Sequence, residues 1–306
     1  DPRTPGAMLM SPLVSIVIPT YNRARDLGRA LTSVRAQTHA QWEALVVDNH
    51  SSDDTERVVG SFDDARMRLF RIHNDGVIAV SRNEGIRRAR GDYVAFLDSD
   101  DWWASRKLEL SLRYLERGAD VVYHDLFAVK TIGQRFFLST LRSRDLARPA
   151  FSDLLGPGNG LINSSVVVRT SVLRAVEGLS EDRNLIAAED YDTWLRIARM
   201  GGIFRRVPRT LGYYWQGDRN LSNPTRLIEN LATIEDRYAD AIREAGAQRC
   251  VYWIAYARGR AHYLQASYEL ARENLKRIGW RRAPFAIWFR AQWMLLRIRL
   301  THPGRI

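Results

Sequence analysis

Short apolar runs alternate with helical stretches along the first hundred residues, and this alternation limits the folds open to the chain more than any other feature. The runs are rich in β-branched residues, which is typical of strands buried on both faces. Such an alternation predicts a parallel, doubly wound sheet, whose ligands bind at the carboxyl ends of the strands. The expected strands are 13–18, 42–47, 68–72, 93–97, 121–123 and 165–169, and the expected helices are 26–37 capped by Asp26, 55–62, 80–89, 191–200 and most of the chain after 224.

Three carboxylates, Asp98, Asp100 and Asp101, follow directly on the apolar run 93–97. Acidic residues are seldom buried, and like charges this close raise one another's pKa unless a cation neutralises them. Oxygen ligands favour Mg²⁺ or Mn²⁺, and a magnesium site commonly combines one or two carboxylates with water and substrate phosphates. The cluster therefore predicts a divalent metal beside a nucleotide diphosphate, with a solvated turn or a helix cap as the structural alternative.

A haloacid-dehalogenase type of phosphatase is a competing interpretation of this cluster, since it also carries Asp-x-Asp after an apolar strand. Two residues beyond the second Asp, such enzymes usually have Thr or Val, whereas this chain has Trp102. Their nucleophile also normally lies near the start of the chain, and here the cluster lies a third of the way along it. Both departures disfavour a phosphatase.

The composition fits a globular enzyme with an anionic partner. The 306 residues allow one large domain, or one with a smaller appendage, and 45% hydrophobic content is enough for a packed core. The net charge of +11 comes almost entirely from arginine, and no acidic residue follows Glu273. The single Cys250 excludes an internal disulfide framework, which fits a reducing compartment. Because no secretory segment is recognised either, we expect a cytoplasmic location. Residues 1–10 are expected to be a tag remnant or disordered start, with the natural start at Met8 or Met10.

Five segments, in this order, resemble the motifs of family 2 glycosyltransferases with the GT-A fold. The resemblance covers about residues 13–222 and implies an α/β fold, with a Rossmann-like, mostly parallel sheet flanked by helices. It implies a glycosyltransferase domain over 11–222, followed by a helical C-terminal region over 223–306 with a basic aromatic tail. The five segments are Val14–Arg23, Val46–Asp53, Ser81–Gly85, Phe96–Trp102 and Ala188–Arg196.

In this family the first two strand ends hold the base and ribose of a nucleotide sugar, through stacking and a few hydrogen bonds. Arg82 matches an arginine that faces the pyrophosphate, with an ordinary surface arginine as its alternative. Asn49 stands where the family more often has a second Asp, so the contact with uracil loses charge assistance. A UDP-sugar is the expected donor, and a dTDP-sugar is the alternative. The implied donor-binding residues are Pro19, Thr20, Tyr21, Asn22, Arg23, Asp48, Asn49, Arg82, Asp98 and Ser99.

The resemblance assigns the metal, Mn²⁺ or Mg²⁺, to Asp98, Asp100 and Asp101. We expect the last two to lie nearest the metal and Asp98 to lie closer to the ribose. The cation would offset the charge that builds on the leaving nucleotide diphosphate. The segment Tyr213–Ser222 resembles a loop that closes over the donor phosphates and that in relatives often carries a metal-binding His. This chain has no His there, so the resemblance supplies no third protein ligand.

Asp190 matches the family's catalytic base, which removes a proton from the attacking hydroxyl in an inverting transfer. Glu189 and Asp192 are alternative bases, or orient neighbouring groups. Acidic residues at the start of a helix are also favoured by the helix macrodipole alone. The Gln-x-x-Arg-Trp signature of processive polysaccharide synthases is missing, which favours the transfer of one sugar at a time.

The segment Phe285–Leu300 mixes large aromatic residues with arginine and is too short and too charged to span a bilayer. It suits the surface of an anionic membrane, on the inner face of the plasma membrane, and a core-packing helix with snorkelling arginines is the alternative. A nucleic-acid partner is disfavoured because no recognised nucleic-acid module accompanies the charge.

The sequence therefore predicts an inverting, metal-dependent glycosyltransferase that moves one sugar from a nucleotide diphosphate to a hydroxyl of a glycan or lipid-linked acceptor. A sugar nucleotidyltransferase is the enzymatic alternative, although the turn at Pro19–Arg23 lacks the Gly-rich loop expected there. A membrane-associated protein that binds nucleotide sugars without turnover is the non-enzymatic alternative.

Overall fold

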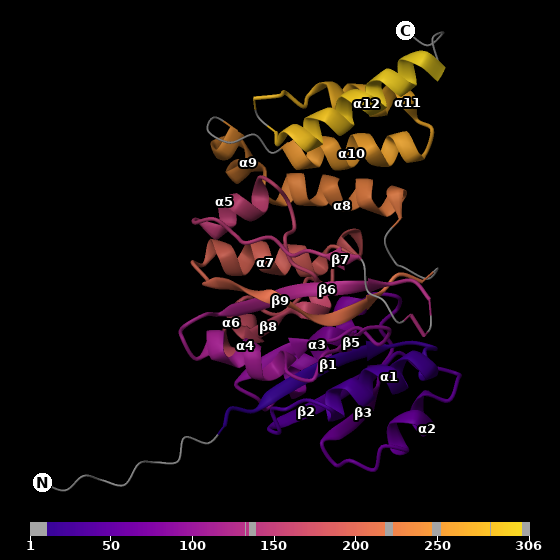
Figure 1. Ribbon diagram of the computed structural model, residues 1–306, viewed down its shortest axis with the longest axis vertical. Helices are drawn as coiled ribbons and strands as arrows, with labels where there is room; N and C mark the ends of the chain where they lie inside the picture. The colour runs from indigo at the N-terminus through magenta and orange to yellow at the C-terminus, as the bar shows by residue number, and fades with distance from the viewer. Residues whose placement is uncertain are drawn as a thin grey trace, which may run out of the picture. The chain divides into compact units, whose positions relative to one another are not determined.

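The computed structural model describes residues 11–131, 133–134, 139–217, 223–246, 252–281 and 283–301 (Figure 1). The chain divides into two compact units, each built from several stretches of sequence. The first contains residues up to 143, 161–178 and 204–216, and the second contains 144–160, 179–203 and 217 onward. The expected tag at residues 1–10 and the expected boundary at residue 222 lie outside the described residues.

The first unit is built on a single mixed sheet. Its strands are β1 Val14–Thr20, β2 Trp42–Asp48, β3 Met67–Arg71, β4 Tyr93–Phe96, β5 Trp102–Trp103, β6 Val121–Val129, β7 Thr140–Leu141, β8 Val167–Arg169 and β9 Phe204–Trp215. The order is β3-β2-β1-β4-β8-β6-β9-β5, with β7 paired to β6. The strands β3, β2, β1 and β4 are parallel, β8 and β5 are antiparallel to their neighbours, and β6 and β9 are parallel. The expected α/β class is confirmed, and both strand directions mix beyond β4.

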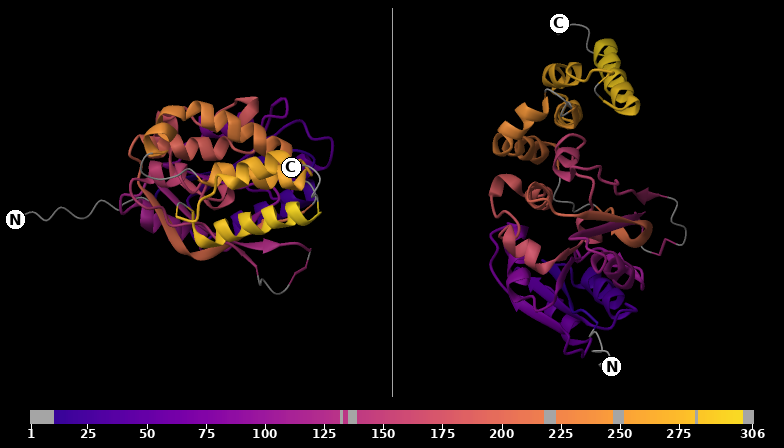
Figure 2. Two further views of the ribbon diagram at one scale, coloured as in Figure 1. Left: turned by 90° about the horizontal axis from the view of Figure 1, so that it is seen from above. Right: turned by 90° about the vertical axis from the view of Figure 1, so that its left-hand side faces the viewer.

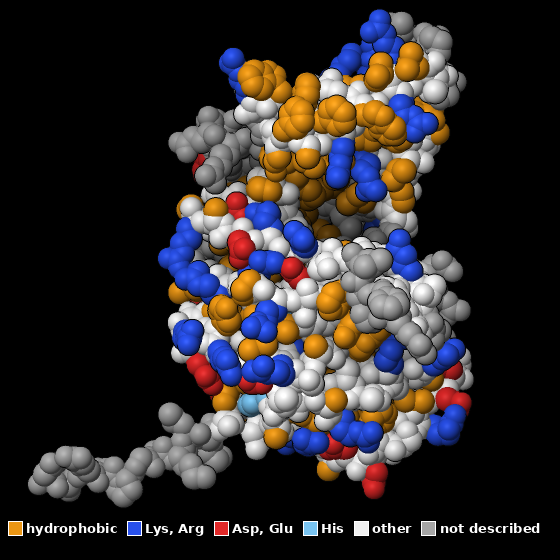
Figure 3. All heavy atoms as spheres, in the orientation of Figure 1, with side chains coloured by type: hydrophobic (Ala, Val, Ile, Leu, Met, Phe, Trp, Pro, Cys, Tyr) orange, Lys and Arg blue, Asp and Glu red, His pale blue; other side chains and the backbone are white. Residues whose placement is uncertain are grey.

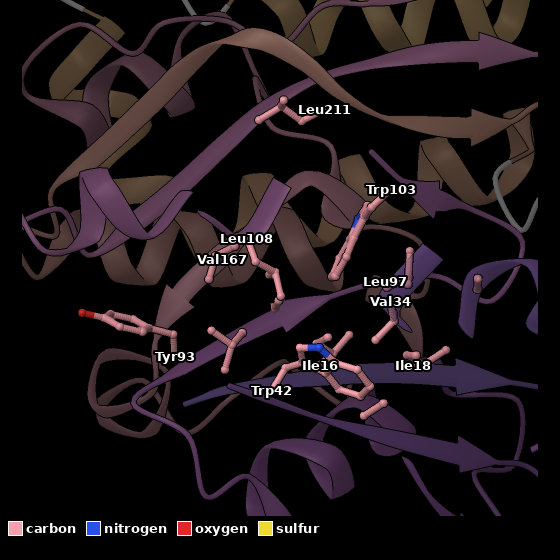
Figure 4. Close-up of a cluster of buried hydrophobic side chains, with 14 of the residues drawn as sticks. Ile16, Ile18, Val34, Trp42, Tyr93, Leu97, Trp103, Leu108, Val167 and Leu211 are labelled. Carbon is pink, nitrogen blue, oxygen red and sulfur yellow. The ribbon is translucent and has the colours of Figure 1, made fainter. Parts of the chain in front are cut away.

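Helices cover both faces of the parallel part of the sheet. The helices of the first unit are α1 Ala24–Arg35, α2 Thr55–Gly60, α3 Ile78–Arg88, α4 Lys107–Leu115 and α6 Thr170–Ala175. On one face, Ile16 and Ile18 of β1 join Val34 of α1 and Leu108 of α4 in the main core (Figure 4). All seven residues of β1 are buried, as expected for a strand covered on both sides.

The opposite face of the sheet carries α3, which lies unusually close to β1. A Cβ atom on Gly85 would meet Val17 Cγ1 at 2.5 Å, so only glycine allows this approach. The glycine of the Ser81–Gly85 motif thus seats α3 against the strand, and Arg82 is fixed on the same helix. This explains physically why the motif combines an arginine with a glycine three positions later.

The second unit is helical. Its helices are α5 Ala150–Leu155, α7 Glu189–Arg199, α8 Pro224–Arg237, α9 Ala239–Gly246, α10 Tyr252–Leu264, α11 Tyr268–Lys276 and α12 Phe285–Thr301. The last three pack on one another around a small core that includes Leu275, Ala291 and Met294 (Figure 2). Among the described residues, none of the helices combines the length and the apolar character needed to cross a bilayer.

Three helices, α1, α3 and α7, each begin two residues earlier than expected. The helix α1 begins at Ala24 with Arg23 as its N-cap residue, so the expectation that Asp26 caps it is wrong. Asp26 lies inside the first turn, where its carboxylate pairs with Arg29 at 3.1 Å. The helix α7 begins two residues earlier than expected and therefore includes Glu189 and Asp190. Both carboxylates lie in its first turn, where the macrodipole favours negative charge.

Candidate active site

The acidic cluster lies at the carboxyl end of β4 and is contacted by three arginines. Arg82 donates to an oxygen of Asp98 at 2.7 Å, and Arg23 donates to Asp100 Oδ2 at 2.5 Å. Arg29 donates to the backbone carbonyl of Asp100 at 2.7 Å. Sequence distances of 16, 77 and 71 residues separate these pairs, so the sheet brings them together. The charge of the cluster is thus partly compensated by the protein itself.

Asp101 is the most buried member of the cluster, with 1% of its surface exposed. Its Oδ1 accepts a hydrogen bond from the backbone N–H of Trp215 at 2.8 Å, at the end of β9. Its Oδ2 is buried without a hydrogen-bond partner in the described part of the chain. A buried carboxylate oxygen without a donor is costly, so Asp101 is a place where a ligand can contribute what the protein does not.

Burial and mutual repulsion hold protons on this cluster more tightly than on isolated carboxyls. Burial, followed by the charge of Asp98, raises the pKa of Asp100 to about 6, although Arg23 acts in the opposite direction. Burial, followed by the charges of Asp100 and Asp98, raises the pKa of Asp101 well above its ordinary value. The charged form of the cluster therefore needs further positive charge to be stable at neutral pH.

A divalent cation fits this requirement only in part. In the described ranges no three His, Cys, Asp or Glu side chains come together as a metal-binding group, so the three carboxylates do not form a ready-made cage. The unpartnered Oδ2 of Asp101 and the raised pKa of Asp100 do fit a cation held by few carboxylates. Magnesium commonly binds in this way, with phosphates and water completing its shell.

The side chains expected to contact the base and the ribose are mostly hydrogen-bonded to other residues of the protein. Asp48 is fully buried and accepts hydrogen bonds from the backbone and hydroxyl of Ser51, with Arg71 3.4 Å away. Asn49 Oδ1 accepts from the backbone N–H of Asn74 at 2.9 Å. The amide oxygen expected to contact uracil is therefore already engaged, although a carbonyl oxygen has a second lone pair.

The turn after β1 divides into a structural and an exposed part. Asn22 Oδ1 accepts from the backbone N–H of Ser52 at 2.8 Å, and the Asn22 N–H donates to Ser51 Oγ at 2.8 Å. Asn22 thus ties two strand-end loops together, which fits the turn-shaping alternative. Tyr21 is 56% exposed and its ring is available to a ligand. Of the remaining expected donor residues, Pro19 lies in the buried β1 strand, and Thr20 and Ser99 are buried at 5% exposure.

Several contacts of polar and aromatic residues near the cluster were not predicted from the sequence. The Trp102 ring stacks on Tyr213 with centroids 5.1 Å apart, and the Arg29 guanidinium lies 4.1 Å above Trp102. Ser164 Oγ accepts from the backbone N–H of Asp98 at 3.1 Å. Next to it, both side-chain polar atoms of Asn163 are buried without a hydrogen-bond partner in the residues described. Of these residues, Trp102 and Tyr213 belong to segments noted in the sequence, and Tyr213 lies at the end of β9 and not in the expected loop.

The expected catalytic base lies in the second unit, in the first turn of α7. Asp190 is half-buried, and its Oδ1 accepts from the backbone N–H of Tyr191 at 2.6 Å. Glu189 is 4% exposed. Asp190 is therefore the more accessible of the two adjacent carboxylates. Access of an acceptor hydroxyl to the carboxylate is a first requirement for a base.

Asp192 has a different environment. It is fully buried, and its carboxylate accepts from Arg196 at 2.8 Å, from Arg237 at 3.0 Å and from the Tyr238 hydroxyl at 3.0 Å. These contacts join α7 to α8 inside the second unit. The position of Asp192 therefore fits the orienting alternative and not that of a second base.

The fold has close counterparts among solved structures. Staphylococcus aureus TarS 1-349 in complex with UDP-GlcNAc superposes with a TM-score of 0.58 at 18% identity, covering 88% of this chain and 82% of TarS. The mannosyltransferase PcManGT from Pyrobaculum calidifontis, in complex with GDP-Man and Mn²⁺, gives a TM-score of 0.59 at 21% identity, covering 96% of this chain and 82% of that one. The chain therefore has the GT-A fold of glycosyltransferases.

Sequence comparison identifies the family. The profile of glycosyl transferase family 2 matches residues 15–176, more than half of the chain. The chain belongs to glycosyl transferase family 2, which confirms the resemblance inferred from its motifs.

The matches to curated relatives cover only part of each relative's length. An uncharacterised glycosyltransferase of Rickettsia felis is 30% identical over 203 residues, 64% of this chain and 32% of the relative. The Escherichia coli protein UDP-Glc:alpha-D-GlcNAc-diphosphoundecaprenol beta-1,3-glucosyltransferase WfgD is 42% identical over 100 residues, 33% of this chain and 40% of the relative. The Bacillus subtilis putative teichuronic acid biosynthesis glycosyltransferase TuaG is 39% identical over 106 residues, 34% of this chain and 42% of the relative. The matched segments thus span well under half of each of these relatives.

Proposed function

We propose that this protein transfers a single sugar from a nucleotide diphosphate to an acceptor hydroxyl, with inversion at the anomeric carbon. The observation that carries the proposal is the arginine-bound acidic cluster at the carboxyl ends of parallel strands. Arg82 and Arg23 hold Asp98 and Asp100 there, beside the buried Asp101. In open α/β sheets this edge is where ligands bind. Membership of a glycosyltransferase family supports the reaction class.

On the donor side, the chain offers charge for the diphosphate and polar groups for the sugar. Arg82 carries a planar fork of N–H donors suited to phosphate oxygens as well as to the Asp98 carboxylate. The buried amide of Asn163 has unused donor and acceptor capacity for sugar hydroxyls. Asp100 and Asp101 would hold Mn²⁺ or Mg²⁺, with Asp98 towards the ribose. When bound, that cation would stabilise the negative charge on the departing diphosphate.

On the acceptor side, Asp190 accepts the proton of the attacking hydroxyl. The oxygen of that hydroxyl forms a bond to C1 of the donor sugar, and the bond from C1 to the diphosphate oxygen breaks. The bonding electrons leave with the nucleoside diphosphate, and the proton stays on the Asp190 carboxyl until it is lost to water. Attack from the side opposite the leaving group gives inversion. The half-buried position of Asp190 in the first turn of α7 supports this role.

A UDP-sugar is the donor that we favour, with dTDP-sugar as the alternative, and a lipid-linked glycan is the acceptor class that we favour. The support is the E. coli relative, whose name specifies a UDP-Glc donor and a diphosphoundecaprenol-linked acceptor. Asn49, which stands where the family more often has a second Asp, still offers an uncharged oxygen that can accept a hydrogen bond from the base.

Nucleotide titration tests the proposal directly. UDP and dTDP are titrated calorimetrically with and without Mn²⁺, and a panel of nucleotide sugars is screened for metal-dependent hydrolysis. We expect metal to strengthen UDP binding at least tenfold and one sugar to be hydrolysed. Binding without turnover of any sugar would favour the non-catalytic alternative, and release of pyrophosphate from UTP and a sugar phosphate would favour a nucleotidyltransferase. Equal UDP affinity with and without metal would contradict the proposed metal role.

A further inference from the structure

The last helix of the second unit, α12, presents apolar side chains on two opposite faces. One face is buried against α10 and α11 through Ala291, Met294 and Ile298. The other face carries five large apolar side chains that are between 47% and 73% exposed. We call this row the outer stripe; it consists of Phe285, Phe289, Trp293, Leu296 and Leu300. Spacings of four, four, three and four positions place these residues along one side of the helix.

Arginines border the outer stripe on both sides. Helical periodicity places Arg290 and Arg297 along one edge and Arg299 along the other, and all three are exposed. The Arg297 guanidinium lies 4.8 Å from the Trp293 ring centroid, so cation and aromatic ring form one surface. No acidic residue occurs in α12 or anywhere after Glu273. Apolar side chains gather over this helix with basic side chains beside them (Figure 3).

We propose that the outer stripe inserts into the headgroup region of an anionic phospholipid bilayer, with α12 lying parallel to the surface. Contiguous exposed apolar rows are uncommon on monomeric proteins unless they contact something. An interfacial helix needs an apolar face of this kind, and lysine or arginine at its borders to meet lipid phosphates. Trp293 is of a type that favours the interface between water and lipid. Phenylalanine and leucine, which make up the rest of the stripe, are typical of the apolar face of an interfacial helix.

Two other occupants of this surface are disfavoured by its charge and its apolar content. A second copy of the same stripe would bring Arg290 and Arg297 against identical arginines, with no acidic side chain on the helix to pair with them. A nucleic acid would satisfy the arginines and leave Leu296 and Leu300 in water. An anionic lipid surface satisfies both kinds of side chain at once. This inference does not rest on the transfer reaction, because it concerns only the surface of α12.

Vesicle flotation of the full chain tests the proposal. We expect binding to phosphatidylcholine vesicles that contain a third of phosphatidylglycerol, and at least tenfold weaker binding to pure phosphatidylcholine. The double variant Phe289→Asp/Trp293→Asp should reduce binding to the anionic vesicles at least tenfold. The matched control is Met200→Asp/Ile203→Asp, which adds the same charges at exposed apolar residues of the same unit outside α12. This control should bind as the wild type does.

A second variant keeps the test decisive if the aspartates impair folding. Arg290→Gln/Arg297→Gln leaves the outer stripe intact and should weaken binding to anionic vesicles while flattening its dependence on salt. The proposal is overturned if the wild type binds neither vesicle, or if both double variants bind as the wild type does. It is also overturned if sedimentation shows a wild-type dimer that the Phe289→Asp/Trp293→Asp variant converts to a monomer, which would assign the stripe to a second copy.

Discussion

Arg82 donates to the Asp98 carboxylate across 2.7 Å, from a side chain that is almost fully buried to one that is partly open to solvent. The arginine is fixed on α3 by the tight contact of that helix with β1 at Gly85. The aspartate is fixed by its backbone N–H, which donates to Ser164 Oγ. Both partners are thus held before any ligand arrives, which lowers the entropy that a diphosphate must lose on binding.

Replacing Arg82 by lysine should therefore weaken nucleotide binding although the charge is kept. A lysine ammonium is a point charge and cannot replace the fork of the guanidinium, so we expect UDP affinity to fall about tenfold or more. Arg82→Gln should in addition lower the free energy of unfolding by about 2 kcal/mol, because Asp98 loses a charged hydrogen bond. Calorimetric titration and urea unfolding measure the two effects. The control Arg87→Gln breaks an exposed pair with Glu84 on the same helix and should change neither quantity measurably.

Asp100 should show a conflict between stability and function. Asp100→Asn removes one of three neighbouring negative charges and so reduces the repulsion within the cluster. We therefore expect the free energy of unfolding of the metal-free protein to rise by about 1–2 kcal/mol. The same variant should lose the strengthening of UDP binding by Mn²⁺. Thermal unfolding in a chelator and titration with Mn²⁺ separate the two. Asp54→Asn, at an exposed ion pair on the surface, is the matched control. A loss of stability in Asp100→Asn would show that its bond with Arg23 outweighs the repulsion.

Replacing Asp190 should affect transfer, whereas replacing Asp192, the other aspartate of α7, should affect stability. Asp190→Asn is expected to reduce transfer about 10²- to 10⁴-fold while UDP affinity and thermal stability stay as in the wild type. Asp192→Asn should instead lower the free energy of unfolding by about 3 kcal/mol, because two arginines and a tyrosine hydroxyl lose a buried charged acceptor. Steady-state kinetics and urea unfolding distinguish them. Near-normal transfer by Asp190→Asn would place the base elsewhere.

The parallel half of the sheet was predictable because its strands are continuous apolar runs. β1, β2 and β4 are buried along their whole length, so their sequences carry the signal of a strand covered on both faces. β9 was not predicted, since it exposes Arg205, Pro208 and Arg209 and alternates irregularly. β5 has only two residues. Edge and partly exposed strands depend on their neighbours, and a local pattern does not contain that information.

In the candidate site, too, some features could be predicted from the local sequence and others depend on the folded sheet. Asp98, Asp100, Asp101 and Arg82 stand out by spacing and charge, and the structure places the arginine on the cluster. Contacts from Arg23 and from the Trp215 backbone span 77 and 114 residues, and only the folded sheet creates them.

His124 should make the stability of the protein sensitive to acid. It is fully buried in β6, where Nδ1–H donates to the Asp125 carbonyl at 2.8 Å, and burial, with help from Lys107, lowers its pKa to about 3. The unfolded chain binds a proton near pH 6.5 and the folded chain does not, so this contribution to stability is complete above pH 6.5 and is lost as the pH falls towards 3. At pH 4.5 the loss amounts to about 3 kcal/mol. In urea unfolding between pH 7.5 and 4.5, the free energy of unfolding of His124→Gln should fall less with decreasing pH than that of the wild type. If the free energy of unfolding falls equally with pH in the wild type and in His124→Gln, other groups cause the acid sensitivity.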